Sequence, residues 1–267
     1  MASTASSAAV PRPLAAGTVP LQHAAGRRFY VRMAAAIVFI AVAGFVPTYW
    51  APVARGSFSG APILHAHGLL FTAWTLVFLA QARFAASGRF EHHRMLGLAG
   101  VSLATAMLLI GIGVSVHSIR GGMAEGFELE ARTFSIVPVT IIVFFAAVVA
   151  AAIASIRRPE VHMRLMLVAT ISMLPPALAR LVRLLAGAPP PGVGAPPTVA
   201  FSLVPNLLAD LLIVVAIVHD WRTRGRPHPA YLIAGGALLA VQLVRVPLSG
   251  TAAWHAVTDW LLRFGGG

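Results

Sequence analysis

Residues 89–94 read RFEHHR, and residues 158–162, which lie 69 positions further on, read RPEVH. Both stretches share the pattern R-x-E-x-H, and a long apolar run follows each of them. A glutamate in the first turn of a helix is stabilised by the helix dipole, and an arginine beside an apolar run favours the membrane surface. Each stretch therefore indicates the start of a helix that enters a membrane.

The composition of the whole chain agrees with this interpretation. Of its 267 residues, 58% are apolar and 10% are charged, whereas about 25% are charged in ordinary soluble domains. The mean hydropathy is +0.83, and several apolar runs reach about 20 residues, which is the length of a helix that crosses a bilayer. The sequence predicts an all-α polytopic membrane protein that has the lipid bilayer as a partner.

The basic charge of the chain is carried by arginine alone. The formal net charge is +12, and all 20 basic residues are arginine. A strongly basic chain can indicate nucleic-acid binding. Here the arginines lie in short loops between apolar runs, where membrane topology explains them. We therefore expect no nucleic-acid partner.

Two missing residue types exclude several classes of protein. Without lysine, the chain can form no Schiff base with retinal and has no phosphate-binding P-loop. Without cysteine, it has no disulfide, no cysteine-ligated iron–sulfur cluster and no C-x-x-C-H haem attachment. The residues that remain for chemistry are ten histidines, eight acidic residues and the arginines.

The chain divides into three expected parts. Residues 1–28 are rich in Ala, Ser and Pro and predict a disordered tail, residues 29–250 a transmembrane bundle, and residues 251–267 a short amphipathic helix. Seven spans are expected in the bundle, at about 30–50, 62–84, 94–117, 134–156, 162–185, 198–219 and 229–247. The pair Pro175-Pro176 is expected to kink the fifth span.

Arginine placement predicts the orientation of the bundle. The tail and the second, fourth and sixth loops carry most of the arginines, at positions 12, 27, 28, 83, 89, 94, 157, 158, 222, 224 and 226. Arginine-rich loops face the cytoplasm, so the N-terminus is expected there and the C-terminus outside. We expect a multi-pass protein of a bacterial inner membrane.

The shared R-x-E-x-H pattern also predicts an internal repeat, in which residues 62–117 and 134–185 are parallel copies of one helical hairpin. Two interpretations of His93 and His162 remain open. In one, these positions are only charged helix starts at the level of the headgroups. In the other, they are symmetry-related ligands that face each other near the cytoplasmic surface, with His219 at a similar depth.

A second polar layer is expected in the outer half of the bundle. It contains His67, His117, Arg180, Arg183 and Asp210. Asp210 lies deep in an apolar span, where an ionised group is costly unless it is paired or hydrated. It is either a functional group or one half of an ion pair with Arg180 or Arg183. For Arg183 the alternative is that its side chain reaches the outer headgroups.

Residues 92–100 (HHRMLGLAG) and 162–170 (HMRLMLVAT) resemble helix starts in uncharacterised bacterial membrane families, some of them associated with haem assembly. The plan of histidines at both faces of a helical bundle is similar to cytochrome b561-like proteins. This resemblance implies haems that are each held by two histidines from different helices. His93 and His162 match the inner pair, whereas His67 would need His117, because the fourth span contains no histidine.

Three functions follow as hypotheses. The first is electron transfer by haem b bound to these histidines, with quinone or a redox protein as partner and arginines on the propionates. If the protein is an enzyme, we expect a membrane redox enzyme. The second is a non-catalytic scaffold or assembly subunit, in which His and Arg only anchor helix ends. The third is a carrier of small anions that uses the outer arginines and Asp210.

Overall fold

The computed structural model describes residues 19–187 and 194–264, so most of the expected tail at 1–28 lies outside the described residues. Within them, every regular element is a helix. Seven segments of the described residues are long and apolar enough to cross a membrane: Arg28–Ala54, Pro62–Ala86, Phe90–Ala124, Glu128–Ala154, Pro159–Leu185, Ala200–Arg224 and Pro229–Leu248. The all-α polytopic membrane class is confirmed, and each expected span corresponds to one segment.

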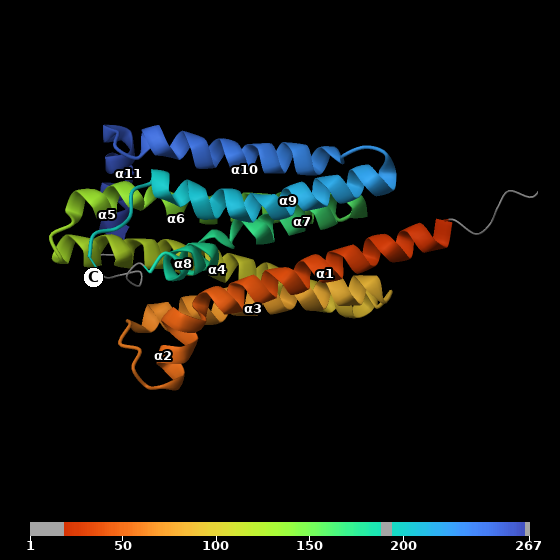
Figure 1. Ribbon diagram of the computed structural model, residues 1–267, viewed down its shortest axis with the longest axis horizontal. Helices are drawn as coiled ribbons and strands as arrows, with labels where there is room; N and C mark the ends of the chain where they lie inside the picture. Colours follow the sequence, from red (N-terminus) through yellow and green to blue (C-terminus); the bar gives the residue numbers. More distant parts are fainter. Residues whose placement is uncertain (1–18, 188–193, 265–267) are drawn as a thin grey trace, which may run out of the picture.

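The long helices run lengthwise through the molecule (Figure 1). In chain order they are α1 (Val19–Phe45), α2 (Ala51–Ala54), α3 (Pro62–Ala86), α4 (Phe90–Ala124), α5 (Glu128–Phe134), α6 (Ile136–Ala154), α7 (Pro159–Ser172), α8 (Pro175–Leu185), α9 (Leu203–Arg224), α10 (Pro229–Leu248) and α11 (Ala252–Phe264). A π-helical turn at Val46–Trp50 joins α1 to α2, and a 3₁₀ turn at Ala200–Ser202 leads into α9.

Three loops lie together at one end of the bundle, which we call the arginine-rich end. They are the connections at 87–89, 155–158 and 225–228, between α3 and α4, α6 and α7, and α9 and α10 (Figure 1). Helices α2, α5 and α11 lie at the other end, which we call the α11 end (Figure 1). Consecutive long helices therefore alternate in direction, as the predicted topology requires.

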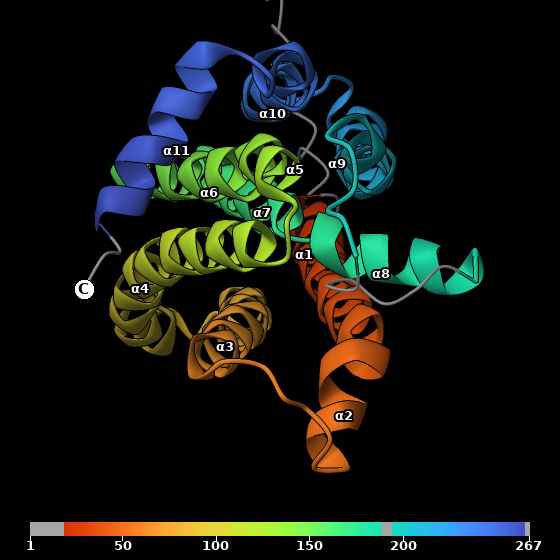
Figure 2. The same cartoon turned by 90° about the vertical axis from the view of Figure 1, so that its left-hand side faces the viewer.

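The fifth span is broken rather than kinked. Helix α7 ends at Ser172, and α8 begins at Pro175 and turns sideways out of the bundle, so it is seen lengthwise where α9 and α10 are seen end-on (Figure 2). Proline has no backbone N–H, so Pro175 and Pro176 cannot continue the hydrogen-bond ladder of α7. The expectation of one kinked helix over 162–185 was too simple.

A continuous apolar core joins the long helices around Trp74, Phe145, Leu167, Tyr231 and Leu238, all of which are buried. The Trp74 indole meets the Phe145 ring edge-on, with 4.9 Å between the ring centroids. Its N–H also donates to the Thr170 hydroxyl, with 3.2 Å between the two heavy atoms. These contacts fix α3 against α6 and α7, the helices that position the site described next.

Candidate functional site

His93 and His162 meet at the arginine-rich end of the bundle. His93 lies in the first turn of α4 and His162 in the first turn of α7. Their ring centroids are 6.4 Å apart, and the two ring planes are close to perpendicular at 82°. Both side chains are half-buried. The structure thus brings together two helix starts that are 69 residues apart in the sequence.

The two imidazoles are anchored in the same way. His93 Nδ1 lies 3.4 Å from the Gln81 carbonyl oxygen on α3, and His162 Nδ1 lies 2.8 Å from the Ala152 carbonyl oxygen on α6. A carbonyl only accepts hydrogen bonds, so we infer that each Nδ1 carries the hydrogen. Each Nε2 then keeps its lone pair. Histidines that bind metals have this arrangement, with the second ring nitrogen held by a carbonyl or carboxylate.

Gln81 adds a polar group beside His93. Its amide nitrogen donates to the His93 carbonyl oxygen at 3.0 Å, and its Oε1 is buried without a partner.

Among the residues that the structure describes, no group of three or more His, Cys, Asp or Glu side chains could hold a metal ion. A bare zinc ion needs three or four protein ligands. Two imidazoles would suit a haem iron better, because a porphyrin would supply the other nitrogens.

His219 lies at the same end but does not join this pair. Its ring stacks flat on the Phe29 ring, with 3.8 Å between centroids and 3° between planes. The two rings line a shallow hollow between α1 and α9, together with Arg222. The expected similar depth is compatible with the structure, but the contact is with α1 and not with His93 or His162.

The expected outer pair of His67 and His117 is not formed. His67 packs on the Phe71 ring at 4.0 Å between centroids, and its buried Nδ1 has no partner. His117 is exposed on α4. From His93 to His117 the helix advances 24 residues at about 100° each, which turns the second side chain about 120° away from the first. Because His67 packs against Phe71 and His117 is exposed on α4, these two residues do not fit a second haem as its ligands.

Arg180 fastens α8 to α1. Its guanidinium stacks over the Phe45 ring at 4.2 Å, and it donates from Nε to the Thr48 hydroxyl at 3.0 Å and from Nη1 to the Pro176 carbonyl at 2.9 Å. These contacts account for the position of its guanidinium without a haem propionate. Arg183 lies one turn further along α8 and is half-buried.

Asp210 contacts α10 rather than α8. Its Oδ1 accepts a hydrogen bond from Gln242 Nε2 at 3.3 Å, and its Oδ2 is buried without a partner. Of the two interpretations left open for Asp210, the ion pair with Arg180 is not among the ion pairs of the described residues. Arg245 is 1% exposed, so it lies inside the protein.

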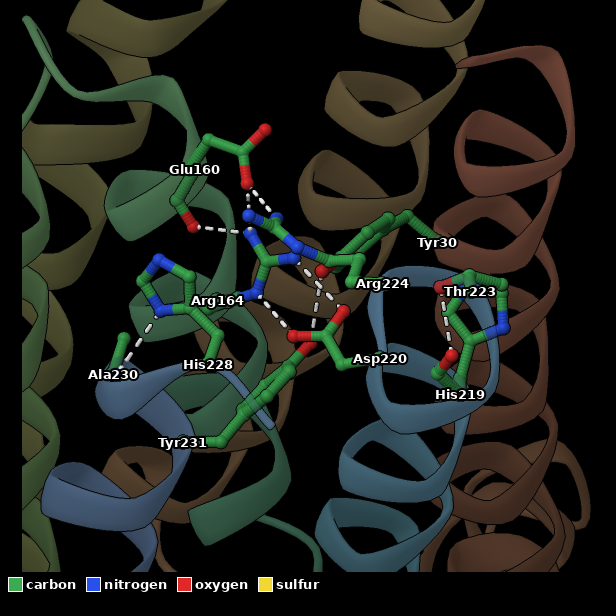
Figure 3. A network of polar contacts seen from close by, with 10 residues as sticks. All are labelled: Tyr30, Glu160, Arg164, His219, Asp220, Thr223, Arg224, His228, Ala230 and Tyr231. Atoms are coloured by element: carbon green, nitrogen blue, oxygen red, sulfur yellow. Dashed lines mark hydrogen bonds and ion pairs between the residues drawn. The ribbon is translucent and has the colours of Figure 1, made fainter. Parts of the chain in front are cut away.

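The sequence analysis missed a polar network around Arg164 (Figure 3). Arg164 is 2% exposed. It donates two hydrogen bonds, from Nε and Nη2, to the Asp220 carboxylate of α9, each 2.8 Å long. Its Nη1 donates to both the carbonyl and the carboxylate of Glu160. Arg224 also pairs with Glu160, so two cations meet two carboxylates.

Two tyrosines complete the network from α1 and α10. The Tyr231 ring lies below the Arg164 guanidinium at 5.7 Å, and the hydroxyls of Tyr30 and Tyr231 are 2.9 Å apart (Figure 3). The network thus joins α1, α7, α9 and α10. The signal was present in the sequence, because Glu160 and Arg164 are four residues apart on one helix face.

The fold and the site define a class of protein: a polytopic α-helical membrane protein with an anchored imidazole pair at its arginine-rich end. No family model, no curated protein and no solved structure matches this chain.

Proposed function

We propose that this protein is a membrane redox protein that holds the iron of one haem b through His93 and His162. The observation that carries the proposal is the matched anchoring of the two imidazoles, each by Nδ1 to a carbonyl of the preceding helix. This hydrogen bond fixes the ring and makes Nε2 a better ligand. A bound haem supplies one-electron chemistry.

The protein's own contribution is to hold the two rings on rigid helices. Trp74 and its contacts lock α3 against α6 and α7, so neither ring depends on a loop for its position. The resemblance to cytochrome b561-like proteins supports the same pair of ligands. In this proposal the electron partner is quinone or a redox protein, and the membrane is the bacterial inner membrane.

The absorbance spectrum of the purified full-length protein tests the proposal. We expect a Soret band, with sharp α-bands after addition of dithionite, and we expect His93→Ala and His162→Ala each to lose or shift these bands. The matched control is His92→Ala, because His92 is exposed beside His93 and should leave the spectrum unchanged. A protein that stays colourless when expressed with excess haem and when reconstituted with it would contradict the proposal.

A second candidate function is a non-catalytic scaffold, and the Arg164 network favours it. All three nitrogens of the Arg164 guanidinium donate hydrogen bonds, and the four charges of the network balance. Such a network ties helices together and leaves little for chemistry. A colourless protein that is folded and that co-purifies with a fixed membrane partner would support this function instead.

A further inference from the structure

Two polar stripes face each other between α9 and α10 near the α11 end, where the two helices lie side by side (Figure 1). The α9 side has a polar residue at every fourth position and the α10 side at spacings of three and four: Ser202, Asn206 and Asp210, opposite Gln242, Arg245 and Ser249. The stripes touch where Gln242 donates to Asp210 at 3.3 Å and where Arg245 Nη2 donates to the Ser202 hydroxyl at 2.9 Å.

The polar groups in these stripes are buried but only partly paired. Asn206, Gln242 and Arg245 are each 1% exposed. Four of their atoms, together with one of Asp210, have no hydrogen-bond partner: Asn206 Oδ1, Gln242 Oε1, Arg245 Nε, Arg245 Nη1 and Asp210 Oδ2. The Arg164 network, at the arginine-rich end, leaves no such atom on Arg164 or Asp220. The stripes therefore contain buried polar atoms without hydrogen-bond partners, whereas Arg164 and Asp220 do not.

The unpaired atoms require a partner that both donates and accepts. The three oxygens need donors, and the two arginine nitrogens need acceptors. Water meets both needs and typically makes about three hydrogen bonds in such buried sites. The two stripes already make direct hydrogen bonds at Gln242 and at Ser202. We therefore expect any partner of the unpaired atoms to be small.

The site is closed toward the arginine-rich end. Between Asp210 and the Arg164 network, α9 and α10 carry buried apolar side chains, including Ile213, Ala234 and Leu238. In the opposite direction, the serines of the two stripes continue to the helix ends. Polar side chains thus lie between Asp210 and the α11 end, whereas apolar side chains lie on its other side.

We propose that these two stripes form a hydrated proton-exchange site, in which the Asp210 carboxylate takes up one proton from water of the α11 side and returns it there. The step forms one O–H bond at Asp210 and breaks one O–H bond of hydronium, leaving water. Arg245 is the charged group that acts on Asp210 from α10, and Arg180 and Arg183 lie on the adjoining helix α8. Arg245 also holds the water beside the carboxylate through its two open nitrogens.

Infrared spectroscopy of the full-length protein in lipid tests this proposal. As the pH is lowered, the wild type should gain a carboxylic C=O band that is missing from Asp210→Asn. Transfer from H₂O to D₂O should shift this band during buffer exchange. The matched control is Asp259→Asn, because Asp259 is an exposed aspartate of α11 that is paired with Arg132, and its loss should leave the band in place.

Three results would overturn the proposal: a band that survives in Asp210→Asn, a band that D₂O does not shift, or a wild type without a difference band. If Asp210→Asn does not fold, Asp210→Glu provides the assignment, since it keeps the carboxyl and should move the band. A variant with Leu238→Asn opens the apolar barrier and should leave the band itself intact.

Discussion

Replacing Arg164 by Gln would leave the Asp220 carboxylate, with a side chain only 3% exposed, without its bidentate partner. Breaking a buried ion pair from one side typically costs about 3–5 kcal/mol. We expect Arg164→Gln to lower the free energy of unfolding in detergent by that amount. Arg94→Gln is the control at the same end, and because Arg94 is exposed it should cost less than about 1 kcal/mol.

Removing both charges of this pair separates its two contributions. In Arg164→Met/Asp220→Leu no buried charge is left alone, so most of the stability lost in Arg164→Gln should return. Unfolding titrations of the single and double variants measure this difference. A double variant as unstable as the single one would show that the guanidinium acts through its other contacts, with Glu160 and Tyr231.

His228 predicts a pH dependence of stability. It caps α10 by accepting the Ala230 N–H at Nδ1, at 3.1 Å, which only an unprotonated ring nitrogen can do. Burial, and then the charges of Arg164 and Arg224, lower the pKa of His228. Because the pKa is lower in the folded protein, the stabilisation is complete above about pH 6.5 and is lost as the pH falls through the folded value.

The measurement is the unfolding midpoint of the wild type and of His228→Asn at several pH values. Asparagine keeps a capping oxygen and does not titrate. The wild type should therefore lose more stability than the variant between about pH 7.5 and about pH 5. Equal losses would mean that other groups carry the pH dependence.

At the residue scale, the sequence identified isolated charges better than paired ones. Asp210 was singled out because it interrupts an apolar run, and the structure places it in a buried polar cluster. Arg164 stands near a helix start, where arginine is common, so its position in the sequence does not indicate that it is buried. Its burial depends on Asp220 and Tyr231 from two later helices, and spacing along the chain does not reveal such partners.

At the scale of elements, the crossing of α1 and α8 depends on a glycine. A Cβ added at Gly44 would lie 2.4 Å from the Ala177 carbonyl oxygen and 2.7 Å from its Cα. Backbone atoms cannot give way as a side chain can, so we expect Gly44→Ala to cost about 1–3 kcal/mol in unfolding free energy. Gly236→Ala in α10 is the control, since an added Cβ there meets nothing within 4 Å.

The helices themselves could be predicted because each is a long apolar run bounded by arginine, proline or glycine. The break between α7 and α8 was only partly predicted. Pro175-Pro176 indicates a kink, but the direction of α8 depends on its contacts with α1, where Arg180 stacks on Phe45 and Ala177 meets Gly44. These contacts join residues more than 130 positions apart, as Gly44 and Ala177 show.

At the scale of the whole molecule, the alternation of seven spans explains why the pair of His93 and His162 could be predicted. It does not determine whether His67 and His117 meet. His93 and His162 each follow an arginine-rich loop, so any bundle with this topology places them at one end. Whether they meet also depends on helix rotation, and here it brings the rings to 6.4 Å. For His67 and His117 rotation has the opposite effect, and His117 faces outward. The internal repeat stays a prediction.

The central claim is that the loops before His93 and His162 lie on one side of the membrane. The chain has no cysteine, so Ser87→Cys, Ser155→Cys and Ser57→Cys each carry a single thiol. With a membrane-impermeant maleimide on intact cells, we expect Ser57→Cys to be labelled at once and the other two only after permeabilisation. Labelling of Ser87→Cys and Ser155→Cys from opposite sides would contradict the account, because the two imidazoles could then share no site.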